Sequence, residues 1–146
     1  MKPLHLATAL IALTAAAGFA HDGVQNPVVM ARMMNMSDMA EQMEVVVNMA
    51  RGQTDFDAEI AQAAMAQLAR DAAATHERFA EPATDPKSEA LPAIWDNFAD
   101  FTERAEATQA SAEAAISAIT SRETLIPAVQ AIGATCGGCH DLYREE

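Results

Sequence analysis

The stretch Cys136-Gly137-Gly138-Cys139-His140 places the strongest constraint on how this chain folds. A C-x-x-C-H sequence is typical of a c-type haem attachment site, where both thiols form thioethers with the vinyl groups and the adjacent imidazole reaches the iron. On a helix, residues three and four positions apart project to one side. Cys136, Cys139 and His140 are therefore predicted to share one helical face that is turned to the interior.

Other uses of a cysteine pair fit this sequence less well. A structural zinc site takes four ligands, often from two such pairs, and this chain has only two cysteines. A thioredoxin-type redox pair needs a neighbouring strand and helix, and no segment has the pattern of a strand. A disulfide between Cys136 and Cys139 would strain a helical turn. The prediction is therefore one haem c, attached through both thiols.

The first twenty residues have the layout of a secretory signal peptide. Lys2 precedes an apolar run over 4–13, and small residues follow up to Ala20. The run is too short for a comfortable membrane span. Cleavage after Ala20 would give a signal peptide over 1–20 and one mature domain over 21–146, with an uncleaved anchor as the weaker alternative. A periplasmic location is expected, because haem is attached to such motifs outside the bacterial cytoplasm.

The chain is strongly acidic. It has 21 acidic and 9 basic residues and a formal net charge of −12, which becomes about −13 if Lys2 is removed with the signal peptide. Nucleic acid is not expected as a partner because no basic patch exists, and acidic membrane surfaces would repel the protein. No membrane insertion is expected after signal cleavage. A redox protein with a basic docking surface fits the charge, as does a simple solvated exterior.

Four helices are predicted, because alanine is abundant and β-branched runs are short. Asn26 suits an N-cap, Pro27 suits a first helical position and Arg51-Gly52 suits a helix stop. A loop over 81–87 contains two prolines. Pro127 favours a late start for the last helix, because proline is tolerated in a first turn and damaging beyond it. The predicted helices cover 27–50, then 55 or 57 to 79, then 92 to about 119, and then run from between 121 and 124 into the motif.

Apolar residues recur in 4-3 steps along each predicted helix and indicate its inward face. Four amphipathic helices with mostly short connections predict an all-α fold, an antiparallel up-down-up-down four-helix bundle with haem on its C-terminal helix. The predicted inward residues are Val29, Met33, Met36, Ala40, Met43 and Val47; Ile60, Ala64, Leu68, Ala72 and Phe79; Ile94, Phe98, Phe101, Ala105, Ala112, Ala115 and Ile119; and Leu125, Val129, Ile132, Cys136, Cys139 and Tyr143.

A C-x-x-C-H motif near the end of an all-helical chain resembles the class II cytochromes c, the cytochrome c′ family. The resemblance covers essentially the whole mature chain, and the haem motif is its most specific part. It implies a haem protein of the periplasm, and it suggests a homodimer formed through the first two helices. The supporting stretches are Arg51-Gly52-Gln53-Thr54-Asp55-Phe56-Asp57, Leu91-Pro92-Ala93-Ile94-Trp95, Gly133-Ala134-Thr135-Cys136 and Cys139-His140-Asp141-Leu142-Tyr143-Arg144.

The family divides by the sixth ligand of the iron. In cytochromes c′ the iron is five-coordinate and can bind small gases, whereas in a low-spin subgroup a methionine of the first helix completes the coordination. Counting back from Arg51-Gly52, the resemblance places that ligand at Met36 and the family's frequent arginine at Arg32. A thioether is a weak, soft ligand that suits haem iron and raises its potential. The resemblance therefore implies His140 and Met36 as iron ligands, with Arg32 near a haem propionate.

Alternatives to these roles remain at this stage. Methionine fills irregular cores well, so most methionines of the first helix are expected to be packing residues. Arg32 is equally well explained as a solvated helix residue. If Met36 is not the ligand, the iron has no sixth ligand or takes one of Met33, Met39 and Met43. A copper(I) surface is a further interpretation, formed by Met30, Met33, Met36 and Met39.

An electron-transfer protein is the function that these features predict. Coordination by histidine and methionine closes the iron, so little has to rearrange between its ferric and ferrous states. A five-coordinate protein that binds or buffers NO or CO is the alternative. A peroxidase-like enzyme comes last, because it would need a distal acid–base group and no histidine lies near Met36 in the sequence. The chain is therefore not expected to be an enzyme.

Overall fold

Helices make up nearly all of the regular structure in the computed structural model, which describes residues 23–145. The long helices are α1 (Pro27–Arg51), α2 (Ala58–Phe79), α4 (Phe98–Ala118) and α5 (Arg122–Tyr143), and α3 (Ala93–Asp96) is a short helix before α4. Within residues 23–145 the only extended pairing is one isolated antiparallel bridge, between Ala90 and Arg144. The predicted signal peptide over 1–20 lies outside the described residues.

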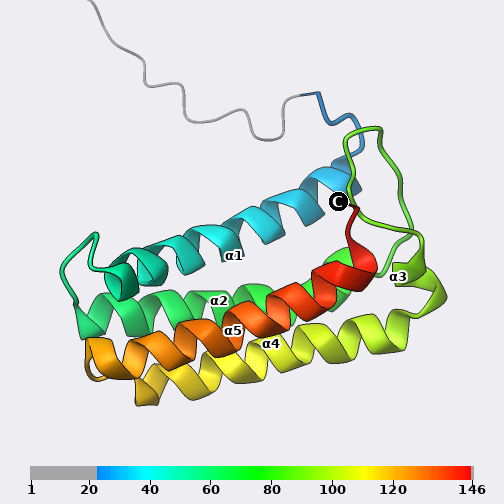
Figure 1. Cartoon of the computed structure of the whole chain (residues 1–146). Helices are drawn as coiled ribbons and strands as arrows, with labels where there is room; N and C mark the ends of the chain where they lie inside the picture. The colour runs from blue at the N-terminus through cyan, green and yellow to red at the C-terminus, as the bar shows by residue number, and fades with distance from the viewer. Residues whose placement is uncertain (1–22, 146) are drawn as a thin grey trace, which may run out of the picture.

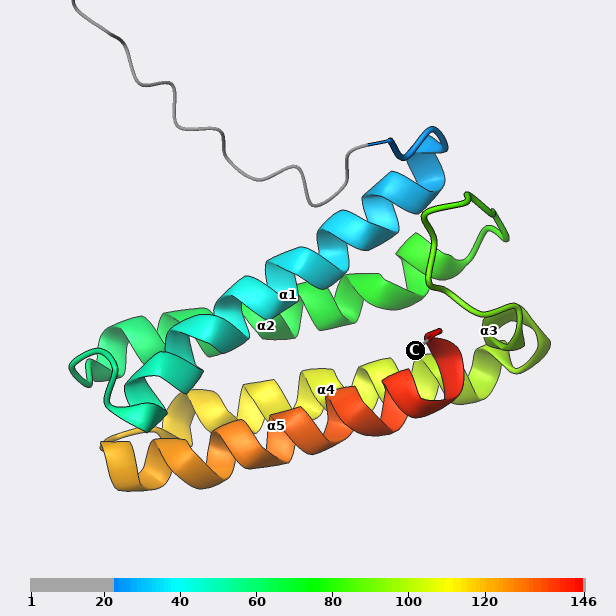
Figure 2. The same cartoon turned by 45° about the horizontal axis from the view of Figure 1, so that its top comes forward.

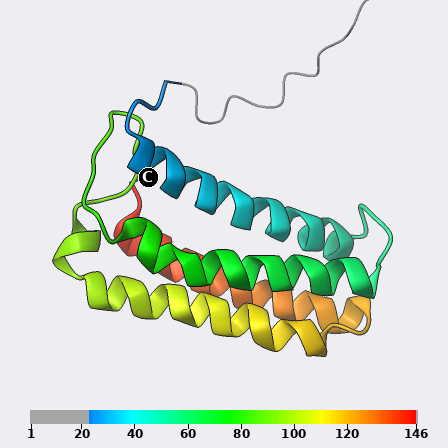
Figure 3. The same ribbon diagram turned by 180° about the vertical axis from the view of Figure 1, so that it is seen from behind.

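Consecutive long helices run in opposite directions (Figure 1). The pair α1 and α2 lies over the pair α4 and α5 (Figure 2), and α2 and α4 lie side by side when the bundle is seen from behind (Figure 3). Among neighbouring long helices, α1 and α5 share the fewest contacts. The predicted all-α, antiparallel up-down-up-down four-helix bundle is confirmed.

Local capping explains the ends of the first two helices. Asn26 Oδ1 accepts hydrogen bonds from backbone N–H groups in the first turn of α1, and Asp57 Oδ1 accepts one from the first turn of α2 at 3.0 Å. The chain leaves α1 at Gly52, whose φ of +70° is left-handed. A Cβ at Gly52 would also lie 2.7 Å from Arg122 Nη2. The predicted bounds of α1 are confirmed to within one residue, and the later of the two predicted starts of α2, Asp57, is its N-cap.

The start of α5 lies within the predicted range of 121–124, but on its early side, against the later start that Pro127 favoured. The helix begins at Arg122, and Ser121 and Thr124 form a capping box before it. Ser121 N–H donates to Thr124 Oγ1 at 3.1 Å, and Thr124 N–H donates to Ser121 Oγ at 3.4 Å. Pro127 therefore lies inside the helix, where it has no N–H for the carbonyl one turn earlier. The cap outweighs that lost hydrogen bond, so the preference for a late start was wrong.

The third predicted helix is interrupted near its beginning. Asn97, with φ of −130° and ψ of 43°, separates α3 from α4. The apolar pattern does not reveal this break, because Ile94 and Phe98 belong to the same apolar cluster on either side of it. The indole Nε1 of Trp95 donates to the carbonyl of Phe79 at 2.9 Å and ties α3 to the end of α2. The predicted single helix over 92–119 was wrong at this point.

Two apolar clusters occupy opposite ends of the bundle. The end with the α1–α2 and α4–α5 turns is called the closed end, and its cluster contains fully buried side chains such as Met65, Ile119 and Leu125. The other end is called the open end, and its smaller cluster has as buried members Phe79, Ile94, Phe101 and Tyr143. Ile60 was predicted to face inward, but it is 52 % exposed.

The inward face of α1 also differs from its predicted apolar stripe. Val29 is buried as predicted, but the rest of the stripe is only half-buried and Ala40 is exposed. The other buried residues of α1 are Arg32, Asn35, Val46 and Met49. The partial exposure of an apolar stripe inside a bundle indicates that something other than a neighbouring helix faces it.

Candidate functional site

A cavity of about 590 Å³ occupies the open end of the bundle. Its volume falls in the range of small-molecule and cofactor sites. All four long helices and residues 88–90 contribute to its walls. The exposed part of the α1 stripe faces this cavity, with side chains that include Met33, Met36, Ala40 and Met43.

The C-x-x-C-H motif contributes to the α5 part of the cavity wall. Cys136, Cys139 and His140 all line it, which confirms their predicted shared face. Both thiols are free, and burial raises the pKa of each. Partial burial lowers the pKa of His140, and the nearby charge of Arg144 lowers it further. These effects favour a neutral imidazole, which is the form that binds a metal.

The methionines of α1 that line the cavity occupy distinct positions. Met36 packs against the open-end cluster, which Cys139 also contacts. Met33 lines the cavity but is not part of either apolar cluster. Two others pack against the closed-end cluster, namely Met39 and Met43. Met36 is therefore the α1 thioether that packs against the same cluster as the cysteine next to His140.

Arg32 is buried in the cavity wall and is only 2 % exposed. Its guanidinium stacks over two aromatic rings, 4.9 Å from the centroid of Trp95 and 5.2 Å from that of Phe79. Burial lowers the pKa of Arg32, but a guanidinium stays charged in proteins. It donates to the backbone carbonyls of Arg78, Glu81 and Ala83. The alternative of a solvated Arg32 was wrong, while its contact with a propionate stays a prediction.

The end of the chain is fastened to the segment before α3. Leu91 N–H donates to the Tyr143 carbonyl at 3.0 Å, and Glu145 N–H donates to the Glu89 carbonyl at 2.8 Å. Arg144 Nε donates to the Glu89 carboxylate at 2.7 Å. Glu89 and Arg144 also line the cavity. This pairing, which sequence reasoning missed, holds the 88–91 segment against the end of α5.

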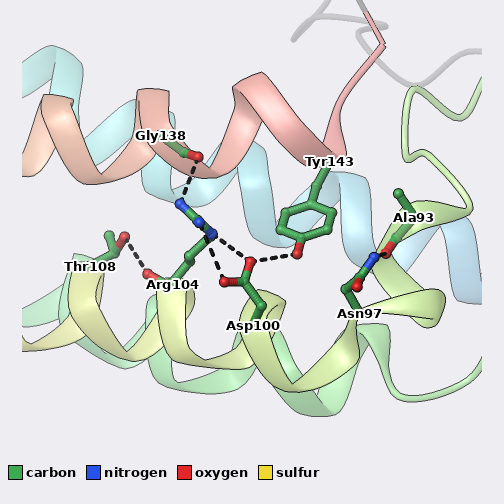
Figure 4. Close-up of polar contacts among 7 residues, drawn as sticks. All are labelled: Ala93, Asn97, Asp100, Arg104, Thr108, Gly138 and Tyr143. Atoms are coloured by element: carbon green, nitrogen blue, oxygen red, sulfur yellow. Dashed lines mark hydrogen bonds and ion pairs between the residues drawn. The ribbon is translucent and has the colours of Figure 1, made fainter.

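A polar network links α4 to the motif on α5 (Figure 4). Arg104 Nη1 donates to the Gly138 carbonyl at 3.1 Å, and Arg104 Nε donates to Asp100 Oδ2 at 2.7 Å. Tyr143 Oη donates to the same Asp100 oxygen at 2.6 Å. The hydrogen bond from Arg104, and to a smaller extent that from Tyr143, holds the pKa of Asp100 below its usual value. Sequence reasoning missed this network, although the four-residue spacing of Asp100 and Arg104 marks a helical ion pair.

The structure gives little support to the other metal interpretations. Within residues 23–145, no three His, Cys, Asp or Glu side chains come together as a metal site, so the motif cysteines have no zinc partners there. Met30 does not line the cavity, whereas the other three methionines of the proposed copper(I) surface do. That set is therefore divided between two environments. None of the helices in the described part of the chain is both long and apolar enough to cross a bilayer.

The residues present fit a covalently bound haem. The cavity is apolar and of cofactor size. On α5 it is lined by two thiols that are in no disulfide and by an imidazole whose lowered pKa favours the neutral form, and on α1 by thioethers. Fold and site together define a four-helix-bundle cytochrome of the haem c type. A family model described as Cytochrome C' matches residues 27–144, and the chain belongs to this family. It therefore carries haem c, with Cys136 and Cys139 as the attachment residues.

Individual relatives agree with this assignment. Cytochrome c-556 of Agrobacterium tumefaciens (strain II Chrys) is 33 % identical over 110 residues, covering 75 % of this chain and 89 % of that protein. Cytochrome c-554 of Cereibacter sphaeroides is 31 % identical over 157 aligned positions, covering 100 % and 99 %. The solved cytochrome c′ from Rhodopseudomonas palustris superposes with a TM-score of 0.77 at 28 % identity, covering 84 % and 98 %.

Proposed function

We propose that this cytochrome is a periplasmic electron carrier whose low-spin haem iron is bound by His140 and Met36. The observation that carries the proposal is the position of Met36. It lines the cavity from α1, and it packs against the same apolar cluster as Cys139, the cysteine adjacent to His140. A thioether so placed suits a sixth ligand better than one packed at the closed end.

The surrounding residues favour electron transfer over substrate chemistry. When bound, the haem supplies a one-electron ferric/ferrous couple. The chain supplies an imidazole on α5 whose lowered pKa favours its neutral form, a mostly apolar lining and a soft thioether that favours the ferrous state. Arg32 uses three of its five N–H donors on backbone carbonyls, which leaves donors free for a haem carboxylate. In this proposal Arg32 orients the cofactor and also connects α1 to the segment after α2.

The proposal includes no catalytic role. A peroxidase-like reaction would need an acid–base group on the α1 side of the cavity. Among the α1 residues that line the cavity, the only ionisable side chain is Arg32, and its guanidinium is held by backbone carbonyls. His140 is the one histidine among the residues that line the cavity, and it is the proposed iron ligand.

The location and partners in the proposal follow from the sequence. The segment 1–20 has the pattern of a signal peptide, and export matches the site of c-type haem attachment. A net charge of −12 favours a redox partner with a basic docking surface. The family resemblance also favours a homodimer through α1 and α2, which analytical ultracentrifugation of the haem protein would detect.

A gas-binding function is the second candidate. It is favoured by the similarity of this fold to a solved cytochrome c′. In that case Met36 would pack beside the iron without binding it. The protein would then carry an open sixth coordination position.

Optical and paramagnetic resonance spectra of the purified haem protein separate the two functions. The electron-carrier proposal predicts low-spin iron in both oxidation states and slow, weak binding of carbon monoxide after reduction. High-spin ferric iron with rapid carbon monoxide binding would overturn the proposal in favour of gas binding. Both results are read from the wild-type protein, without a variant that could misfold.

A further inference from the structure

The turn that holds the motif is braced from outside α5 by Arg104 of α4. The guanidinium reaches the Gly138 carbonyl, which lies between the two cysteines and two residues before His140. The same guanidinium is held by Asp100 through Nε at 2.7 Å and Nη2 at 3.3 Å. Asp100 is held in turn by the hydroxyl of Tyr143 at 2.6 Å, so the network begins and ends on α5 (Figure 4).

The geometry of this network depends on arginine. A guanidinium is planar and presents several N–H donors in fixed directions, so it can bind a carboxylate on one edge and a carbonyl on another. A lysine ammonium carries the same charge, but it cannot hold both partners with the same fixed geometry. The network is only partly shielded from solvent, with side-chain exposures of 35 % for Arg104 and 46 % for Asp100. Bulk stabilisation by such an exposed pair is small.

The charge of Arg104 is also felt at the motif. Its Nη1 lies 3.1 Å from the carbonyl oxygen of Gly138, between the two attachment cysteines. A positive charge close to the haem-bearing turn disfavours ferric iron, which has one positive charge more than ferrous iron. Residues that orient a metal ligand from outside the coordination shell commonly tune the metal in this way.

We propose that Arg104 is a positioning residue for the haem-bearing turn, which fixes the orientation of His140 through the Gly138 carbonyl and raises the reduction potential through its charge. Asp100 and Tyr143 hold Arg104 in place. This inference rests on the proposed function only in treating His140 as a ligand of the haem iron, and that role is the same whether or not Met36 also binds the iron.

The test compares three variants of the haem protein by potentiometric titration and by paramagnetic resonance of the ferric state. Arg104→Gln removes both the positive charge and the planar set of N–H donors. It is expected to shift the ferric/ferrous equilibrium about threefold toward ferric iron, where a tenfold shift corresponds to about 59 mV. Arg104→Lys keeps the charge, so its potential should stay near wild type while its resonance spectrum changes as in Arg104→Gln. Arg70→Gln is the matched control, because it removes an exposed arginine whose side chain bonds to Gln67 on the same helix.

A merely structural role for Arg104 would give a different result. Arg104→Gln would then lower the melting temperature while its potential and spectrum matched those of Arg70→Gln, and this would overturn the proposal. If Arg104→Gln fails to fold, Asp100→Asn replaces it, since this change loosens Arg104 and keeps its positive charge. Asp100→Asn is expected to raise the potential and change the spectrum, and a wild-type potential and spectrum would overturn the proposal.

Failure of the proposed function remains distinguishable from failure of this inference. High-spin iron in the wild-type protein would overturn the electron-carrier proposal alone. Equal potentials and spectra for Arg104→Gln and Arg70→Gln would overturn the positioning role alone.

Discussion

The two ends of the bundle differ in how their apolar side chains are covered. At the closed end, side chains from all four long helices bury one another completely, as Met65, Ile119 and Leu125 show with 0 % exposure. At the open end, the apolar face of α1 meets a cavity of about 590 Å³, and side chains such as Met36 stay half-buried. The closed end is completed by the chain itself, whereas the open end needs the haem to complete its core.

This difference indicates where stability and function reside. A cavity of that size has room for the haem to supply the van der Waals contacts that its apolar lining lacks from neighbouring helices. The chain's own hydrogen bonds hold the segments around it, through Arg32 and the 88–91 pairing. At the open end the chain therefore holds the walls of the site, and the haem supplies the packing inside it.

Removing the attachment cysteines should have the largest effect. The double variant Cys136→Ser/Cys139→Ser, co-expressed with a c-type maturation system, is expected to lose covalent haem entirely. Hydrogen exchange should then become faster at open-end amides, while closed-end amides around Leu125 keep most of their protection. Denatured variant protein that still retained haem would contradict the assignment of these two cysteines as the attachment residues. Equal loss of protection at both ends would contradict the distinction between them.

A cavity made at the closed end should lower stability without changing the site. Leu125→Ala is expected to reduce the free energy of unfolding by about 3 kcal/mol, because its side chain is fully buried. The visible spectrum of the native haem protein should stay that of wild type. Urea denaturation measures the free energy of unfolding. Ile60→Ala, at a position that is 52 % exposed, is the control and should change stability by less than about 0.5 kcal/mol.

The two N-caps allow a matched comparison between the ends. Asn26 caps α1 at the open end and Asp57 caps α2 at the closed end. Asn26→Ala and Asp57→Ala are each expected to cost about 1 kcal/mol in urea denaturation. In the chain without haem, the cost of Asn26→Ala should shrink, because the open end is then already loosened. An unchanged cost in both forms would mean that haem does not tighten the start of α1.

The smallest expected effect is a dependence on pH. The folded-state pKa of Asp100 is lowered by Arg104 and Tyr143, so its contribution to stability is present above the unfolded-state pKa and is lost as pH falls through the folded-state value. Wild type should therefore melt at a higher temperature than Asp100→Asn near neutral pH, with the gap closing below about pH 4. Asp55→Asn, in the α1–α2 turn, is the control. A gap that is constant with pH would refute the role of this carboxylate.

What could be predicted from the sequence was local. Asn26, Asp57 and Gly52 define helix ends through their immediate neighbours, so the boundaries of α1 and α2 followed from the sequence. The C-x-x-C-H spacing is equally local, and it correctly placed the motif on the inner face of α5. These features need no knowledge of how the helices pack.

The rest depended on tertiary structure or on competing local signals. The break at Asn97 was hidden because the apolar pattern continues across it. The preference for the later side of the predicted start range of α5 was wrong because a capping box competes with Pro127. The bond from Arg104 to Gly138 arises only when α4 and α5 meet. The distinction of Met36 from its neighbouring methionines likewise required the positions of the two apolar clusters.

Coordination of the haem iron by Met36 can be measured through the ferric paramagnetic resonance spectrum of Met36→Leu, recorded beside that of Met33→Leu. Both side chains line the cavity from α1, and both substitutions replace a thioether by an apolar group of similar volume. Met36→Leu is expected to convert low-spin iron to high-spin iron with the haem still attached, whereas Met33→Leu should leave the spectrum unchanged. A low-spin Met36→Leu protein, or a high-spin wild type, would rule out Met36 as the sixth ligand.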